Sequence, residues 1–76
     1  MDQIKIAGFI ASCRKEVNLT QKQLAERLGI TVKAISKWEN GVTMPDTSIM
    51  LELCDILGIS VNELLSGEKM DMENDK

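Results

Sequence analysis

The sequence predicts an all-α fold, a compact bundle of five helices in a single domain. Hydrophobic residues make up 43% of the 76-residue chain, yet Trp38 and Phe9 are its only aromatic residues, so the core is aliphatic. Pro45 is the only proline, which leaves long stretches free to be helical. The same helix-start signal also recurs at three places. A chain of this length forms one domain, near the lower limit for a self-sufficient core.

The first helix is expected over residues 2–17. Its apolar side chains recur at spacings of three and four and therefore share one face, which is formed by Ile6, Phe9, Ile10, Cys13 and Val17. The pair Asn18-Leu19 is expected to end it.

Three later helix starts repeat one pattern. Each has a hydroxyl residue that can accept a bond from an unpaired backbone N–H, namely Thr20, Thr31 and Ser60. Apolar residues stand just before each cap and four positions after it, as Leu19/Leu24, Ile30/Ile35 and Ile59/Leu64. Gln23 and Glu63 complete capping boxes with Thr20 and Ser60. These signals predict helices over residues 21–28, 32–39 and 61–65.

The fourth helix is expected over residues 47–57, with Asp46 as its cap. Glycines, which favour the left-handed end of a helix, follow the predicted helices at Gly29, Gly41, Gly58 and Gly67. Residues 1–67 are predicted to form the domain, with a helix-turn-helix core at 20–41. Residues 68–76 form an acidic tail that we expect to be disordered.

Several function classes are disfavoured. The chain has no histidine, no glycine-rich phosphate loop and no CxxC spacing, so we expect no enzyme, no metal site and no cofactor. Cys13 and Cys54 are read as buried, reduced thiols. Neither a secretion signal nor an apolar stretch of membrane-spanning length is seen, which favours a cytoplasmic protein and no membrane partner.

Charge is unevenly distributed along the chain. Residues 1–45 carry seven basic and four acidic side chains, whereas residues 46–76 carry two basic and eight acidic ones, so the net charge of −3 hides a basic N-terminal half. Because salt screens charges beyond about 10 Å, a local basic surface suffices to attract an anionic partner.

The second and third predicted helices are joined by only three residues, Gly29-Ile30-Thr31, with the small Ala25 at the point of close approach. Such a connection is typical of a DNA-binding helix-turn-helix. Ile35 and Trp38 are expected to face the core, which leaves Val32, Lys33, Ser36 and Lys37 outside. Lysines suit phosphates or the O6/N7 edge of guanine, and valine suits a thymine methyl. Taken alone, this face is also compatible with an ordinary solvated surface.

The runs Thr20-Gln21-Lys22-Gln23-Leu24-Ala25-Glu26-Arg27-Leu28-Gly29-Ile30 and Ile35-Ser36-Lys37-Trp38-Glu39-Asn40-Gly41, with Pro45 and residues 57–65, resemble the Cro and phage-repressor (XRE-like) family. The resemblance covers about residues 6–67 and implies a lambda-repressor-like domain. It implies DNA contacts at Thr20, Gln21, Lys22, Thr31, Val32, Lys33, Ser36, Lys37 and Asn40. It also implies that Gln21 binds a phosphate and braces the third helix, and that Arg14 and Glu39 form a partly buried salt bridge.

Val32 and Lys33 replace the paired glutamines with which some relatives read adenine, so this face is shifted toward phosphate or guanine contact. Thr43 and Met44 add little charge where relatives often carry lysine or arginine.

The function predicted is a sequence-specific regulator of transcription, a repressor that binds a palindromic operator on double-stranded DNA as a homodimer. The expected dimer surface comprises Ile56, Leu57, Val61, Leu64, Leu65 and Met70, although the same residues would equally complete the monomer core. The alternative function is a protein-interaction module, such as an antitoxin or a partner-controlled regulator, in which the acidic tail with Met70 and Met72 binds a protein partner.

Overall fold

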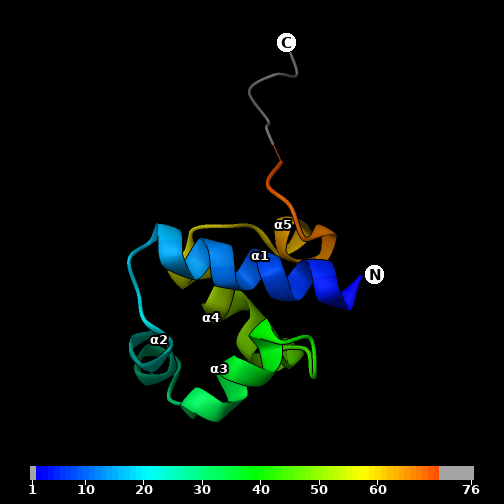
Figure 1. Cartoon of the computed structure of the whole chain (residues 1–76). Helices are drawn as coiled ribbons and strands as arrows, with labels where there is room; N and C mark the ends of the chain where they lie inside the picture. Colours follow the sequence, from blue (N-terminus) through cyan, green and yellow to red (C-terminus); the bar gives the residue numbers. More distant parts are fainter. Residues whose placement is uncertain (1, 71–76) are drawn as a thin grey trace.

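The computed structural model describes residues 2–70 and confirms the all-α bundle, with no strand among these residues. Five helices follow one another along the chain: α1 Gln3–Glu16, α2 Gln21–Leu28, α3 Val32–Glu39, α4 Thr47–Leu57 and α5 Val61–Ser66. Figure 1 shows α1 crossing the front of the molecule with α4 behind it, α5 beside α1, and α2 and α3 together at the opposite edge.

The predicted capping boxes are present. The Thr20 hydroxyl accepts from the Gln23 N–H at 3.0 Å, and the Gln23 side chain accepts from the Thr20 N–H at 2.9 Å. Ser60 and Glu63 form the same reciprocal pair at 3.0 and 2.8 Å. The Thr31 hydroxyl caps α3 through the N–H three residues on. The Asp2 carboxylate caps α1 in the same way, accepting from the N–H groups of Ile4 and Lys5. Four of the five helix starts are therefore fixed by short-range interactions.

The prediction that Asp46 caps α4 is only partly right. Asp46 occupies the N-cap position of α4 with an extended backbone, but its side chain accepts no backbone N–H. Instead, the carboxylate accepts a hydrogen bond of 2.7 Å from the hydroxyl of Ser48, two residues on. The start of α4 is therefore held without a side-chain cap.

The first turn of α1 rests on the turn that follows α3. Gly41 lies in the left-handed region, with φ +74°, and a Cβ built there would stand 2.8 Å from Cδ1 of Ile4. Beside it, the Gln3 side chain donates to the Gly41 carbonyl at 2.8 Å. This contact between residues 38 apart in the chain fixes the C-terminal end of α3 against α1.

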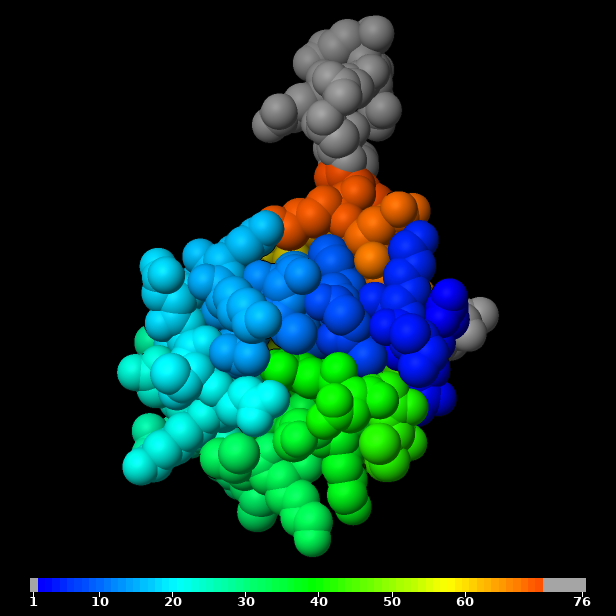
Figure 2. All heavy atoms as spheres, viewed as in Figure 1, coloured from blue at the N-terminus to red at the C-terminus, as the bar shows by residue number. Residues whose placement is uncertain are grey.

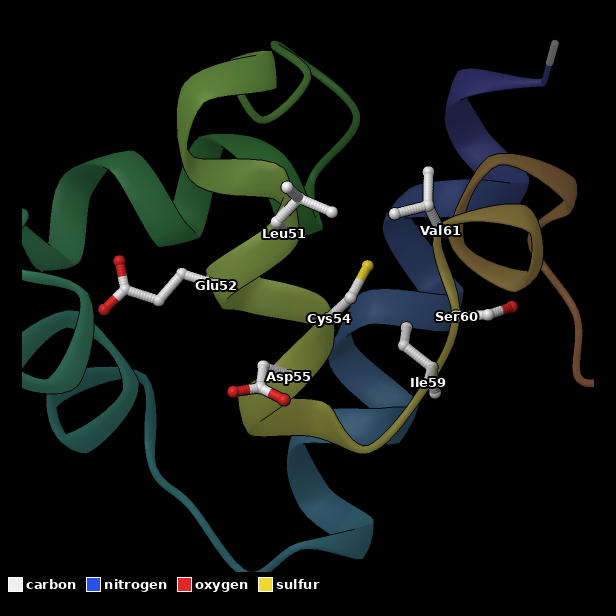
Figure 3. Close-up of a pocket in the computed structure, with 7 residues that line it drawn as sticks. All are labelled: Leu51, Glu52, Cys54, Asp55, Ile59, Ser60 and Val61. Atoms are coloured by element: carbon white, nitrogen blue, oxygen red, sulfur yellow. The ribbon is translucent and has the colours of Figure 1, made fainter.

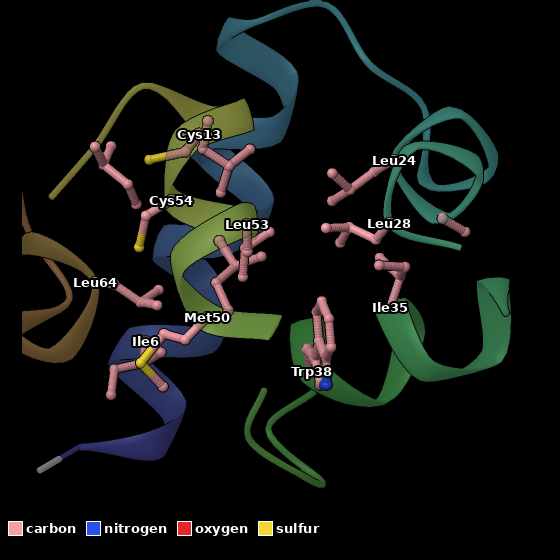
Figure 4. Packing of buried hydrophobic residues seen from close by; sticks show 14 residues of the cluster. Ile6, Cys13, Leu24, Leu28, Ile35, Trp38, Met50, Leu53, Cys54 and Leu64 are labelled. Carbon is pink, nitrogen blue, oxygen red and sulfur yellow. The ribbon is translucent and has the colours of Figure 1, made fainter. Parts of the chain in front are cut away.

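The core is aliphatic apart from Trp38, as the composition predicts. Figure 4 shows α2 and α3 directing Leu24, Leu28, Ile35 and Trp38 toward α4. Cys13 and Cys54 are free and buried, and burial raises the pKa of both thiols.

Two residues of the predicted dimer surface belong to this core instead. Leu57 is 4% exposed and Leu64 is fully buried, so the prediction that they contact a second copy is wrong. Their side chains are already packed within the monomer, which is the alternative that the sequence left open. Ile56, Val61 and Leu65 are half-buried, and Met70 is exposed.

The first residues of the predicted tail run against α1 and α5. Glu68 pairs with Lys5 at 3.5 Å, and Lys69 pairs with Glu16 at 2.9 Å. The Met70 N–H donates to the Glu63 carboxylate at 2.9 Å. The rest of the predicted tail, residues 71–76, lies outside the described residues.

Candidate nucleic-acid interface

The helix pair α2–α3 turns sharply over Gly29, Ile30 and Thr31. Gly29 has φ +69°, and the Ile30 N–H returns to the Ala25 carbonyl at 3.0 Å, which closes α2 tightly. Ala25 is 2% exposed, so its small side chain permits close packing of the pair. Figure 2 shows the two helices (cyan to green) at the edge of the molecule opposite residues 68–70 (orange).

The outer side of α3 carries a basic face, here defined as Val32, Lys33, Ser36 and Lys37. Val32 is 42% exposed, both lysines are exposed, and Ser36 is half-buried. Within residues 2–70, neither lysine takes part in an ion pair. Ile35 and Trp38 point the other way, into the core. The basic face therefore presents two uncompensated positive charges to an incoming ligand.

The starts of α2 and α3 border this face. Thr20, Lys22 and Thr31 are exposed, and Gln21 is half-buried. The unpaired N–H groups at a helix start, together with the helix dipole, favour an anion such as a phosphate. The residues predicted from the resemblance thus lie on α2, on α3 and in the turn between them, with Thr20 at the N-cap of α2 and Asn40 at the C-cap of α3.

A partly buried ion pair supports α3 from behind. The Arg14 Nε donates to Glu39 Oε2 at 2.7 Å and Nη2 donates to Oε1 at 3.1 Å, while the two side chains are only 11% and 7% exposed. A further hydrogen bond of 2.8 Å joins Arg14 Nη1 to the Leu19 carbonyl. The hydrogen bond to Glu39 raises the pKa of Arg14. Because Arg14 neutralises Glu39 inside the domain, this carboxylate does not offset the exposed lysines.

Gln21 joins the same network. Its Nε2 donates to Glu39 Oε1 at 2.9 Å, so residues of α1, α2 and α3 meet at one carboxylate. The amide N–H₂ of Gln21 therefore already has one partner within the domain. At the other end of the face, the Asn40 Nδ2 donates to the Ser36 carbonyl at 2.8 Å and lies 3.2 Å from its hydroxyl. This bond leaves the Asn40 side-chain oxygen free of any partner in the structure's described part.

Sequence reasoning missed one residue that holds α3. The Gln3–Gly41 hydrogen bond fixes the end of this helix, but no local pattern links positions so far apart. Within residues 2–70, no three His, Cys, Asp or Glu side chains are placed to hold a metal ion, and no helix is both long and apolar enough to cross a membrane.

Comparison with known proteins points to one family. The family model described as Helix-turn-helix matches residues 10–64. The transcriptional repressor RstR of the cryptic phage CTXphi in Vibrio cholerae is 36% identical over 61 residues, which cover 80% of this chain and 54% of RstR. The antitoxin PezA of Streptococcus pneumoniae is 31% identical over 65 residues, or 86% of this chain and 41% of PezA. This chain thus spans about half the length, or less, of these curated relatives.

Among solved structures, the DNA-binding domain of the P22 C2 repressor superimposes with a TM-score of 0.79 at 30% identity, covering 92% of each chain. The fold agreement extends over all five helices rather than the hairpin alone. The chain therefore belongs to the helix-turn-helix family, in its XRE-like, phage-repressor type.

Proposed function

We propose that this chain binds double-stranded DNA sequence-specifically and regulates transcription as a repressor, with α3 as the recognition helix in the major groove. The observation that carries the proposal is the basic face, whose two lysines are exposed and form no ion pair with any residue from 2 to 70, while Glu39, the acid at the end of α3, is bound to Arg14 behind it. The role implies the cytoplasmic location expected from the sequence.

Each candidate residue has a role that fits its position. Lys33 and Lys37 lie one helical turn apart and reach phosphates or the O6/N7 edge of guanine, and Val32 contacts a thymine methyl. Thr31 and Ser36 offer hydroxyls beside them. Thr20, Gln21 and Lys22, at the start of α2, and Asn40 contact the sugar-phosphate backbone, which fixes the register of the domain.

The proposed functional unit is a homodimer on a palindromic operator. One domain of this size reads too few bases for strong selectivity, whereas two domains on half-sites about 34 Å apart read twice as many. The similarity to RstR and to the P22 C2 repressor, both named repressors, supports this assignment.

Selection of bound duplexes from a random DNA pool, followed by binding titrations over salt, tests the proposal. We expect a palindromic consensus and an affinity that falls steeply as salt rises. Lys33→Ala with Lys37→Ala should lower the affinity and make the salt slope shallower, by about one for each phosphate that the variant no longer neutralises. Lys15→Ala removes a positive charge from α1 and is the matched control. Absence of binding to any duplex at low salt would contradict the proposal.

The protein-interaction alternative draws support from the similarity to PezA. It predicts a chain whose main ligand is a protein and whose lysine variants in α3 keep full partner binding. The same titrations separate the two functions, because only DNA binding requires the basic face.

A further inference from the structure

A hollow of about 590 Å³ lies between α4 and the start of α5, away from the basic face. This α4–α5 hollow is lined by Leu51, Glu52, Cys54, Asp55, Ile59, Ser60 and Val61. Figure 3 shows the Cys54 side chain at its centre, with Leu51 and Val61 on either side. None of the seven lining residues is basic, and both acids are exposed, so the hollow repels phosphates. Discrimination between DNA sequences therefore rests with the basic face.

Ser36 is the only side chain of the basic face that can both donate and accept a hydrogen bond. Lys33 and Lys37 only donate, and Val32 does neither. A serine hydroxyl on its own discriminates poorly, because it bonds the donors and the acceptors of a base edge alike. Its preference is decided by the partner that already occupies one of these two roles within the protein.

Asn40 is that partner, one turn further along the chain. Its Nδ2 donates to the Ser36 carbonyl at 2.8 Å and to the Ser36 hydroxyl oxygen at 3.2 Å. The shorter bond fixes the amide with its N–H₂ end toward Ser36. Both acceptors belong to one residue, so a single N–H can bifurcate between them and leave the second N–H for the proposed phosphate contact.

The direction of this bond determines what Ser36 offers to DNA. Because Asn40 donates to the hydroxyl oxygen, the hydroxyl keeps its proton to donate, and accepting a bond makes it a stronger donor. Serines within helices often donate this proton to the carbonyl four residues back. Within residues 2–70, however, the Ser36 hydroxyl donates to no acceptor, so its proton is available to an incoming base.

We propose that Asn40 is a positioning residue that makes Ser36 a hydrogen-bond donor, so that α3 selects a base edge carrying an acceptor. The acceptors of the major groove are N7 of either purine, O6 of guanine and O4 of thymine, whereas cytosine presents only its N4 amino group. Ser36 therefore contacts a purine or thymine and disfavours cytosine. The inference rests on the proposed DNA-binding function and assigns one position of its sequence preference.

Selection from a random DNA pool with the wild type and with Ser36→Ala locates the base pair that Ser36 reads. Ser36→Ala should relax the preference at that pair alone. Replacing the acceptor there, with a 7-deazapurine or 4-thiothymine, should weaken wild-type binding about fivefold, the size expected for one hydrogen bond. The same replacement should leave the affinity of Ser36→Ala unchanged, because that variant has no hydroxyl to lose the bond.

Asn40→Asp reverses the bond and distinguishes positioning from a merely structural role. A carboxylate has no N–H to offer, so it accepts from the Ser36 hydroxyl, which then presents only lone pairs to DNA. The preferred base at the Ser36 position should change to one that offers an amino group, N4 of cytosine or N6 of adenine. Loss of a purely structural contact would lower the affinity for all duplexes and leave the preferred base unchanged.

Asn62→Asp is the matched control. Asn62 is exposed on α5, so this variant gains the same negative charge away from the basic face and should keep the wild-type base preference. The ratio of affinities for two duplexes that differ at the Ser36 position removes the general loss that a negative charge causes. Circular dichroism checks that each variant folds.

The possible results separate this inference from the proposed function. A wild type that binds DNA sequence-specifically, with an Asn40→Asp variant that keeps the wild-type preference, would overturn the role of Asn40 and leave the function intact. A wild type that is insensitive to the acceptor replacements would do the same. Absence of binding to any duplex at low salt would overturn the function and this inference together.

Discussion

The basic face of α3 and the α4–α5 hollow are opposites in chemistry. The first exposes lysines that have no ion-pair partner among residues 2–70, and its helix is anchored by the partly buried Arg14–Glu39 ion pair. The second has an apolar centre around Leu51, and the acids Glu52 and Asp55 stand at its rim. The difference shows why the net charge of −3 says little about the ligand, since opposite charges are sorted onto separate surfaces.

The largest effect on stability is expected from the loss of the Arg14–Glu39 ion pair, which supports the basic face. Arg14→Ala strands the Glu39 carboxylate in a site where it is 7% exposed, and breaking such a pair destabilises a protein by about 3 kcal/mol or more. Urea unfolding measures the destabilisation. Lys69→Ala breaks the exposed pair with Glu16, where solvent screening leaves little stabilisation to lose, and is the control. Equal destabilisation in both variants would mean that the buried pair does not anchor α3.

An intermediate effect on stability is expected at two glycines, Gly41 after α3 and Gly58 after α4. Gly41→Ala and Gly58→Ala both place a side chain in the left-handed region, at a cost of about 1–2 kcal/mol. At Gly41 the new Cβ also meets Ile4 Cδ1 at 2.8 Å, the end of a 69% exposed side chain that can move aside, whereas nothing lies within 4 Å at Gly58. Gly41→Ala should therefore unfold at only slightly lower urea than Gly58→Ala. Identical behaviour would show that the α1 contact does not hold the end of α3.

The smallest effect concerns Glu63 on α5. Hydrogen bonds from the N–H groups of Met70 and Ser60 hold the pKa of this carboxyl below its ordinary value of 4.5. Because the pKa is lowered in the folded state, the stabilisation is fully present above pH about 4.5 and is lost as the pH falls through the folded-state value. The stability difference between wild type and Glu63→Gln, measured by urea unfolding from pH 7 to pH 3, should shrink on acidification. A difference that stays constant with pH would contradict this assignment.

Local signals explain what the sequence could predict. The caps at Thr20 and Ser60 need only residues three positions apart, and the glycine ends need only one residue each, so helix boundaries follow from short patterns. The inward direction of Ile35 and Trp38 follows from their spacing along α3. The resemblance added Arg14 and Glu39, which lie 25 residues apart and are joined in the structure.

Contacts between residues far apart in the chain explain what the sequence could not predict. The burial of Leu57 was within reach of periodicity, because Met50, Leu53, Cys54 and Leu57 follow the three-and-four spacing of one helix face and Leu51 lies off that face. The Gln3–Gly41 bond was not, since it joins residues that lie 38 positions apart. At Asp46, the Ser48 hydroxyl donates to the carboxylate that was expected to cap the start of α4.

The placement of Trp38 has a spectroscopic consequence. It is the only tryptophan in a chain without tyrosine, and its indole lies 6% exposed on the inner side of α3. Its emission should be blue-shifted in the native domain and move to longer wavelength when the packing beneath α3 loosens. Because the basic face points the other way, bound DNA should leave this fluorescence nearly unquenched. The fluorescence of Trp38 thus reports whether α3 is packed on the core, independently of whether DNA is bound to the basic face.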